Sequence, residues 1–303
     1  MDYSIFKLQF PVGVHFGNGF LNDSVYTFAS DTLFSALYIE ALKMQLSDEL
    51  FEAVKIGKLL FSDAMPYRGN QYMVPKPIFP IEHTDNSGSS IAKKKHKNLK
   101  YLPVESFALY LQGKWEADTD PMENFGEACH QTMAAVRKED DTLPFHVGTY
   151  YFKKGNGLYV IIAYQSEKEL ELAETLLQAV SLVGIGGKRA SGLGKFELFY
   201  GKNSSALEEM LNRQSGYYMT LSMALPQKDE LPQALEGSTY LLAKRSGFVA
   251  SDTYAEEQRR KRDLYVFVAG SCFKNRFSGD IYDVSAGGGH AVYRYAKPLF
   301  MGV

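Results

Sequence analysis

The sequence is poor in cysteine and tryptophan, and it contains no long apolar run. Of its 303 residues two are cysteines, Cys129 and Cys272, and one is a tryptophan. Cysteines this far apart form neither a disulfide framework nor a paired metal motif, which favours a reducing, cytoplasmic compartment. No stretch approaches about 18 uninterrupted apolar residues, and the opening MDYSIFKLQF lacks a basic segment followed by an apolar run. We therefore expect no signal peptide and no membrane partner.

The chain also lacks a strong net charge. Its 33 lysines and arginines against 35 acidic residues leave a formal charge of −2, which excludes a globally basic nucleic-acid binder. The basic residues are nevertheless clustered, at 93–97, 186–189, 243–245 and 259–262. Local field and contact matter more for phosphate binding than total charge, so RNA binding remains open. Each cluster taken alone is equally compatible with a solvated loop.

Two segments have the apolar periodicity of amphipathic helices. Residues 31–44 place several apolar side chains on one face, with Ser30 or Asp31 available as the helix cap. Residues 166–184 form the strongest candidate, because Ser166 and Glu169 have the spacing of a capping box. A glycine-rich stretch ends this second helix.

Aromatic residues, almost all Tyr and Phe, make up 14% of the chain and favour β-strands. We predict strands at 3–10 and 195–200, and a hairpin at 147–165 around Lys-Gly-Asn-Gly. With the two helices, residues 1–200 have the element order of a ferredoxin-like unit, and residues 201–303 suggest a second, degenerate one. The predicted fold class is α+β, with two ferredoxin-like (RRM-like) units, antiparallel sheets and a Gly-rich loop.

The Gly-rich loop, GIGGKRASGLG at 184–194, has the composition of an anion-binding segment. It matches neither the dinucleotide fingerprint nor the P-loop. Its order is helix, loop, strand, so the loop meets the negative end of its helix rather than the positive one. Anion binding would rest on backbone N–H groups and on Lys188, Arg189 and Ser191, which suits an extended polyphosphate such as single-stranded RNA. The alternative is a glycine-capped turn.

Two positions near the N-terminus are candidates for chemistry. His15 could serve as general acid or base in a metal-independent ribonuclease, although RNA contact is the favoured interpretation. Phe16 is either a stacking platform for a base or a core residue. Ser30 opens a helix and is a candidate phosphate contact. Asp31 is an alternative catalytic residue, but a cap role is the favoured explanation.

Two later segments add candidate RNA contacts. Basic residues, a flexible pair and an aromatic follow one another, as single-stranded RNA binding requires, in Lys244, Arg245, Ser246, Gly247 and Phe248. Near the C-terminus, Arg294 is a candidate contact for RNA or a partner. The basic run 259–262 is either a solvated helix end or a further contact. No motif for a metal or a cofactor is present, so none is predicted.

The loop pattern G-x-G-G-K-R-x-S-G-x-G, between the second helix and the last strand of a ferredoxin-like unit, resembles the RAMP superfamily of CRISPR proteins. Further stretches narrow the resemblance to the Csm-type (type III-A) effector subunit at the crRNA 5′-handle end: FASDTLFSAL (28–37), VPKPI (74–78), SGF (246–248), DLYVF (263–267) and HAVYRYAKPLF (290–300). The resemblance extends from one end of the chain to the other.

This resemblance implies a non-catalytic subunit that grips the crRNA 5′ handle. Its implied partners are the large polymerase/cyclase-like Csm subunit and a backbone RAMP subunit. The loop residues that match the family's are Lys188, Arg189, Ser191, Gly192 and Gly194. A thumb-like insertion is expected near 80–103. The alternative functions are a RAMP endoribonuclease that processes CRISPR repeat RNA with His15 as general acid/base, and a general single-strand RNA-binding module.

Overall fold

The computed structural model describes residues 1–17, 19–80, 98–115, 120–135, 143–202, 204–251 and 253–303. Its centre is an antiparallel seven-stranded sheet with the order β11-β1-β10-β5-β6-β7, in which β4 also pairs with β10. These strands are β1 (Asp2–Gln9), β4 (Leu59–Phe61), β5 (Met65–Arg68), β6 (Gln71–Pro75), β7 (Tyr101–Pro103), β10 (Asn156–Tyr164) and β11 (Glu197–Tyr200). The predicted combination of helices with antiparallel sheets is confirmed.

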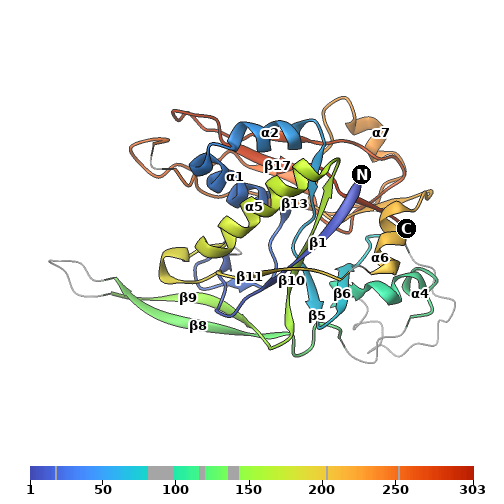
Figure 1. Cartoon of the computed structure of the whole chain (residues 1–303), viewed down its shortest axis with the longest axis horizontal. Helices are drawn as coiled ribbons and strands as arrows, with labels where there is room; N and C mark the ends of the chain where they lie inside the picture. The colour runs from blue at the N-terminus through green and yellow to red at the C-terminus, as the bar shows by residue number, and fades with distance from the viewer. Residues whose placement is uncertain (18, 81–97, 116–119, 136–142, 203, 252) are drawn as a thin grey trace.

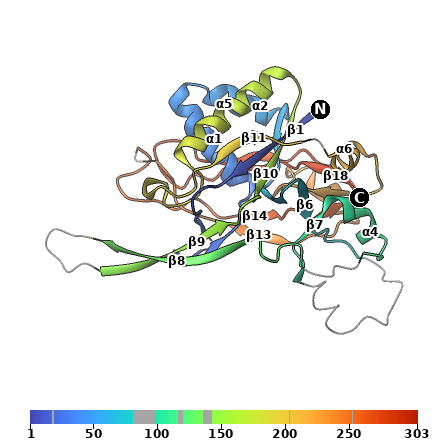
Figure 2. The same ribbon diagram turned by 60° about the horizontal axis from the view of Figure 1, so that its bottom comes forward.

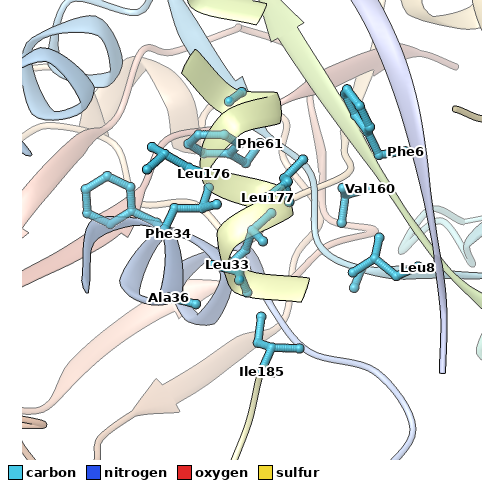
Figure 3. Close-up of a cluster of buried hydrophobic side chains, with 14 of the residues drawn as sticks. Phe6, Leu8, Leu33, Phe34, Ala36, Phe61, Val160, Leu176, Leu177 and Ile185 are labelled. Atoms are coloured by element: carbon cyan, nitrogen blue, oxygen red, sulfur yellow. The ribbon is translucent and has the colours of Figure 1, made fainter. Parts of the chain in front are cut away.

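Three helices cover one face of this sheet: α1 (Ser30–Met44), α2 (Ser47–Lys55) and α5 (Glu167–Val183) (Figure 1). Strand side chains alternate between the two faces, so Phe6 of β1 and Val160 of β10 point toward the helices. They meet Leu33 and Phe34 of α1 and Leu177 of α5 in one buried cluster (Figure 3). The predicted capping box at the start of α5 is present and confirmed.

The other face of the sheet is covered by the C-terminal part of the chain. There Ile5 and Tyr159 pack with Leu207, Met219 and Met301 in a second buried cluster. The covering elements from this part are α6 (Ser205–Asn212), β12 (Tyr218–Thr220), β15 (Cys272–Phe273) and β18 (Phe300–Gly302), and α4 (Phe107–Leu111) packs beside them. Because β10 is buried on both faces, its sequence is a continuous apolar run rather than an alternating one. Within the described residues, no helix has the length and apolarity needed to cross a membrane.

Smaller elements complete the fold. The 3-10 turns are η1 (Val104–Ser106) and η2 (Arg189–Ser191), and a short helix α7 spans Leu231–Leu235. Three two-stranded ribbons pair β2 (Phe16–Gly17) with β3 (Ser24–Val25), β13 (Leu242–Arg245) with β14 (Leu264–Phe267), and β16 (Asp280–Asp283) with β17 (Tyr293–Ala296). Tyr295 of β17 is fully buried in the first cluster, so segments from both sides of residue 200 share one core.

A long hairpin of β8 (Gly126–Ala135) and β9 (Leu143–Phe152) extends away from the body of the molecule (Figures 1 and 2). The predicted hairpin at 147–165 is therefore wrong. The chain does turn there, but β9 pairs with β8, whereas β10 enters the central sheet beside β1. A local turn signal cannot reveal that β10 buries both of its faces among distant strands. Of the predicted thumb at 80–103, residues 81–97 lie outside the described part of the chain.

The Gly-rich loop is held to the body by its own backbone. Gly184 ends α5, and Gly194 and Ile185 bond across the loop, with Ile185 N donating to Gly194 O over 2.9 Å. The side chain of Ile185 is buried among Leu8 and Leu33 (Figure 3). The two ends of the loop are thus fixed, and residues 186–192 project between them.

The start of α1 is stabilised by a residue from another segment. Neither Ser30 nor Asp31 caps the helix, because Ala29 occupies the cap position and makes no side-chain bond. Instead, Asp63 Oδ1 accepts the backbone N–H of Ser30 at 2.8 Å and that of Met223 at 3.0 Å. Asp63 therefore joins the first helix to the segment after β12, and the predicted cap role of Ser30 or Asp31 is wrong.

Alanine substitutions at Gly192 and Gly194 should distinguish two reasons for glycine in the loop: a left-handed backbone and a lack of space for a side chain. Both have a left-handed backbone, with φ of 85° and 78°, which costs an alanine about 1–2 kcal/mol. At Gly194 the added methyl would also overlap the carbonyl oxygen of Ile185, whereas nothing lies within 4 Å at Gly192. In urea unfolding, we expect Gly192→Ala to lose about 1–2 kcal/mol and Gly194→Ala clearly more. Equal losses would contradict this packing.

Asp63→Asn should change how stability depends on pH. Burial raises the pKa of Asp63 to about 6 from 3.8, although the Ser30 and Met223 N–H groups lower it. The folded state then binds the proton more tightly, so this group's contribution to stability is lost as pH rises from about 4 to about 6. Asparagine keeps an acceptor for both N–H groups and does not ionise. The unfolding free energy of the variant minus that of the wild type should rise over this pH range and then level off. A difference that stays constant with pH would contradict the raised pKa of Asp63.

Candidate functional site

A cleft of about 260 Å³ lies where four segments of the chain meet Lys261, which comes from a fifth. The start of α1, the Gly-rich loop, the end of β13 with the following turn, and β17 each contribute side chains to it. Six of its lining residues matter for its chemistry: Asp31, Arg189, Arg245, Phe248, Lys261 and Arg294. Three segments that the sequence analysis singled out separately thus converge on one place.

The floor of this cleft is an ion-pair network around Asp31. Arg245 binds its carboxylate through two nitrogens, with Nε to Oδ2 at 2.9 Å and Nη2 to Oδ1 at 2.7 Å. Arg294 donates from Nη1 to Oδ2 at 2.5 Å. Burial by itself would raise the pKa of Asp31, but the two guanidinium groups hold it below its ordinary value. Both carboxylate oxygens are occupied, so Asp31 is not placed to accept a proton from a substrate.

Positive charge exceeds negative charge in the cleft. Of the described residues that line it, four are cations (Arg189, Arg245, Lys261 and Arg294) and Asp31 is the one carboxylate. A concave site with this balance attracts anions. Among the described residues, no group of three or more His, Cys, Asp or Glu side chains is arranged to hold a metal ion.

The Gly-rich loop joins the cleft to β9 of the long hairpin. Gly187 N donates to the carbonyl of His15 at 2.9 Å, and a side chain at Gly187 would come within 2.6 Å of the His15 ring. His15 Nδ1 bonds in turn to Gly148 O of β9 at 2.6 Å. On the outer side of the loop, Lys188 Nζ lies 4.9 Å from the centre of the Phe145 ring. His15 therefore connects the loop to the hairpin, and it is buried.

The predicted RNA contacts fall into three groups. Those brought together in the cleft are Arg189, Arg245, Ser246, Gly247, Phe248 and Arg294. Those on the adjoining loop are Lys188, Ser191, Gly192 and Gly194, of which Ser191 is exposed and Gly194 is buried. Those elsewhere are His15, which is buried between the loop and β9, and the three residues described next.

Three other predicted contacts do not line the cleft. Phe16 is 4% exposed and packs its ring against Phe10 and Phe28, so its position matches the core alternative. Ser30 is completely buried. Lys244 points to the opposite side of β13 from Arg245 and pairs with Asp263 at 3.3 Å. These placements follow from side-chain direction, which sequence alone does not reveal.

Lys261 was missed as an individual residue. It belongs to the basic run 259–262, which the sequence analysis treated as a whole. In the structure Arg262 points outward and bonds to Asp283 O, whereas Lys261 lines the cleft. Alternation in an extended segment was the signal available, since neighbouring side chains of such a segment face opposite ways.

Comparisons with known proteins identify the family of this chain. A family model described as the CRISPR Csm4 C-terminal domain matches residues 213–303. The protein "CRISPR system Cms protein Csm4" of Mycobacterium tuberculosis is 40% identical over 306 residues, and its namesake in Streptococcus thermophilus is 35% identical over 308. Each alignment covers 99% of this chain and 98% of the relative.

Solved structures share the fold. A chain in the crystal structure of the Csm3–Csm4 subcomplex of the type III-A CRISPR-Cas interference complex matches with a TM-score of 0.68 at 18% identity, covering 99% of both chains. One in the Csm1–Csm4 cassette with pppApA matches with a TM-score of 0.61 at 21% identity, over 100% of this chain and 98% of the other. The resemblance to a Csm-type subunit is confirmed. With relatives at 35–40% identity along nearly its whole length, the chain belongs to the Csm4 family of CRISPR proteins.

Proposed function

We propose that this chain is the crRNA 5′-handle-binding, structural subunit of a type III-A Csm effector. The observation that carries the proposal is the convergence of Arg189, residues 245–248 and Arg294 on one positively charged cleft beside the Gly-rich loop. RNA binding depends mainly on phosphate contacts, and these require cations and N–H donors placed along an extended groove. The loop and the cleft together supply such a path.

Base stacking is the second part of the proposed grip. Phe248 is 51% exposed at the edge of the cleft, and the Arg260 guanidinium lies 5.5 Å from the centre of its ring. An exposed aromatic ring beside arginines is suited to stack on an unpaired base, whatever the identity of that base. The expected recognition therefore combines phosphate contacts with stacking and has modest sequence selectivity.

A structural role fits the site better than a ribonuclease. The alternative enzyme needs His15 as a general acid or base, with access to the RNA. His15 is 7% exposed and its Nδ1 bonds to a backbone carbonyl. The second candidate, Asp31, is held in ion pairs with two arginines. His15 does not line the cleft, and both carboxylate oxygens of Asp31 already accept hydrogen bonds from the arginines.

The proposed partners are a large polymerase/cyclase-like subunit and a backbone RAMP subunit, between which the chain forms a bridge. The similar solved structures are a Csm1–Csm4 cassette and a Csm3–Csm4 subcomplex. This chain carries apolar side chains that are exposed when it is alone. One such group is Tyr240, Leu241, Leu242 and Tyr265, each between 39% and 60% exposed. Clustered exposed apolar residues are typical of protein interfaces.

We also infer that residues 1–200 form a ferredoxin-like RAMP unit. The order β11-β1-β10-β5, with α1 and α5 on one face, is the order 4-1-3-2 of a β-α-β-β-α-β unit. Residues 201–303 are then the second, degenerate unit. The β8–β9 hairpin interrupts the first unit before β10 and is the protrusion nearest to the Gly-rich loop.

Charge reversal in the Gly-rich loop tests the proposed grip. In Lys188→Glu/Arg189→Glu, two cations that adjoin the phosphate path become repulsive, and we expect the crRNA content of the purified complex to fall at least about ten-fold. Lys195→Glu makes the same kind of change at an exposed position that does not line the cleft. This control should load normally. Normal loading of the double variant would show that the loop is not the grip.

The identity of the RNA is tested by sequencing. We expect small RNAs that co-purify with the tagged chain to share one short, repeat-derived 5′ end, and a large cyclase-type subunit to accompany them. Random 5′ ends without partners would overturn the handle-binding proposal and favour a general RNA-binding module. Defined cleavage of repeat RNA by the purified chain without metal, abolished by His15→Ala, would favour the ribonuclease.

A further inference from the structure

We propose that Lys261 and Arg294 together hold one backbone phosphate of the bound RNA, and that Asp31 is the positioning residue that fixes Arg294 for this contact. The inference rests on the proposed RNA-binding function and assigns one ligand group to one pair of side chains. Three features support it: the unpaired donor of Arg294, the unpaired charge of Lys261, and the shape of the segment that carries Lys261.

Arg294 has one donor left over after its structural bonds are made. Its Nη1 donates to Asp31 Oδ2, and its Nη2 donates to the carbonyl of Ser246 at 3.2 Å. Its Nε is buried and has no partner among the described residues. A buried donor without a partner costs free energy, and native structures rarely tolerate one unless a ligand or water supplies the acceptor. Since Arg294 is 5% exposed and lines the cleft, an anion in the cleft is a suitable acceptor.

Lys261 brings a second cation that lacks a counter-ion. Its Nζ makes no hydrogen bond or ion pair with any residue that the structure describes. Burial lowers the pKa of Lys261, and the nearby Arg294 and Arg245 lower it further, with Asp31 acting in the opposite sense. Three cations so close together repel one another, and one carboxylate does not offset all three. A phosphate in the cleft would relieve this repulsion.

The backbone places Lys261 at the cleft by a fixed geometry. Lys261 N donates to Gly247 O at 2.8 Å, and Val249 N donates to Arg259 O at 2.9 Å. These bonds form a narrow ribbon in which Phe248 lies opposite Arg260. Lys261 and Phe248 therefore belong to one rigid unit. A phosphate at Lys261 would leave the neighbouring base close to the exposed ring of Phe248, which favours RNA over an acidic protein segment as the occupant.

Lys261→Ala tests the phosphate contact against a matched neighbour. The probe is a short fluorescein-labelled oligouridylate, and its affinity for the full-length chain is measured by anisotropy over a series of salt concentrations. Loss of one phosphate contact should weaken binding about ten-fold and reduce the slope of log affinity against log salt by about 0.7. Arg262→Ala removes an equal charge outside the cleft and should change affinity less than about two-fold. Lys261→Arg keeps the charge and should bind like wild type.

Asp31→Asn distinguishes a role of Asp31 in positioning Arg294 from a purely electrostatic effect of its charge. The substitution removes a negative charge from a site for phosphate, so electrostatics alone predicts tighter binding. If Asp31 positions Arg294, affinity should instead fall several-fold. Unchanged or tighter binding by a folded Asp31→Asn chain would overturn the positioning role. Should the variant fail to fold, the Nε–H resonance of Arg294 in the wild-type chain decides: it should shift when oligouridylate binds, and no shift would overturn the proposal.

The outcomes for this inference and for the proposed function differ. Weaker oligouridylate binding by Lys261→Ala, together with random 5′ ends in the co-purified RNA, would keep the phosphate contact and overturn handle binding. A shared 5′ end, together with wild-type affinity in Lys261→Ala, would keep handle binding and overturn the phosphate contact.

Discussion

The ion pairs of Asp31 with Arg245 and Arg294 are the interaction on which the cleft depends. They join the first turn of α1 to Arg245 and Arg294, which lie 214 and 263 positions further along the chain. A buried carboxylate is tolerated only when charged partners and hydrogen bonds offset its loss of hydration, and here two guanidinium groups do so. The same bonds hold both arginines beside the Gly-rich loop. One carboxylate thus links the N-terminal part of the chain to the C-terminal part and holds the positive charges of the site in place.

The Gly-rich loop has two roles that use different glycines. Gly184 and Gly194 have positive φ and lie against backbone, so they are needed to form the loop itself. Gly192 also has positive φ but faces open space, where a ligand backbone can approach without meeting a side chain. A structural turn and an anion-binding surface were alternatives at the level of sequence. In the fold, the glycines that the turn requires and the glycine that faces open space are successive parts of one segment.

The central sheet positions these parts by burying both of its faces. Helices α1 and α5 cover one face, and the C-terminal segment that includes β12 and β18 covers the other. The C-terminal half therefore does not pack as an independent body; it supplies Arg245, Lys261 and Arg294 to a cleft whose remaining wall comes from the N-terminal half. Division of the site between two halves explains why no single stretch of sequence contains it.

Elements whose signals are local can be predicted from the amino-acid sequence. The capping box of α5, the apolar stripe of α1, the glycine loop and the clusters of basic residues could all be predicted, because each depends on neighbours a few positions away. The partner of β9, the role of Asp63 as the cap of α1 and the burial of Phe16 and Ser30 could not. In the sequence, Lys244, Arg245 and Lys261 are equivalent, because each is a basic residue within a basic cluster. In the fold, Arg245 and Lys261 line the cleft with Asp31 and Arg294, whereas Lys244 faces away. Sequence does not reveal this difference, because side-chain direction depends on strand register and on contacts between residues more than 200 positions apart.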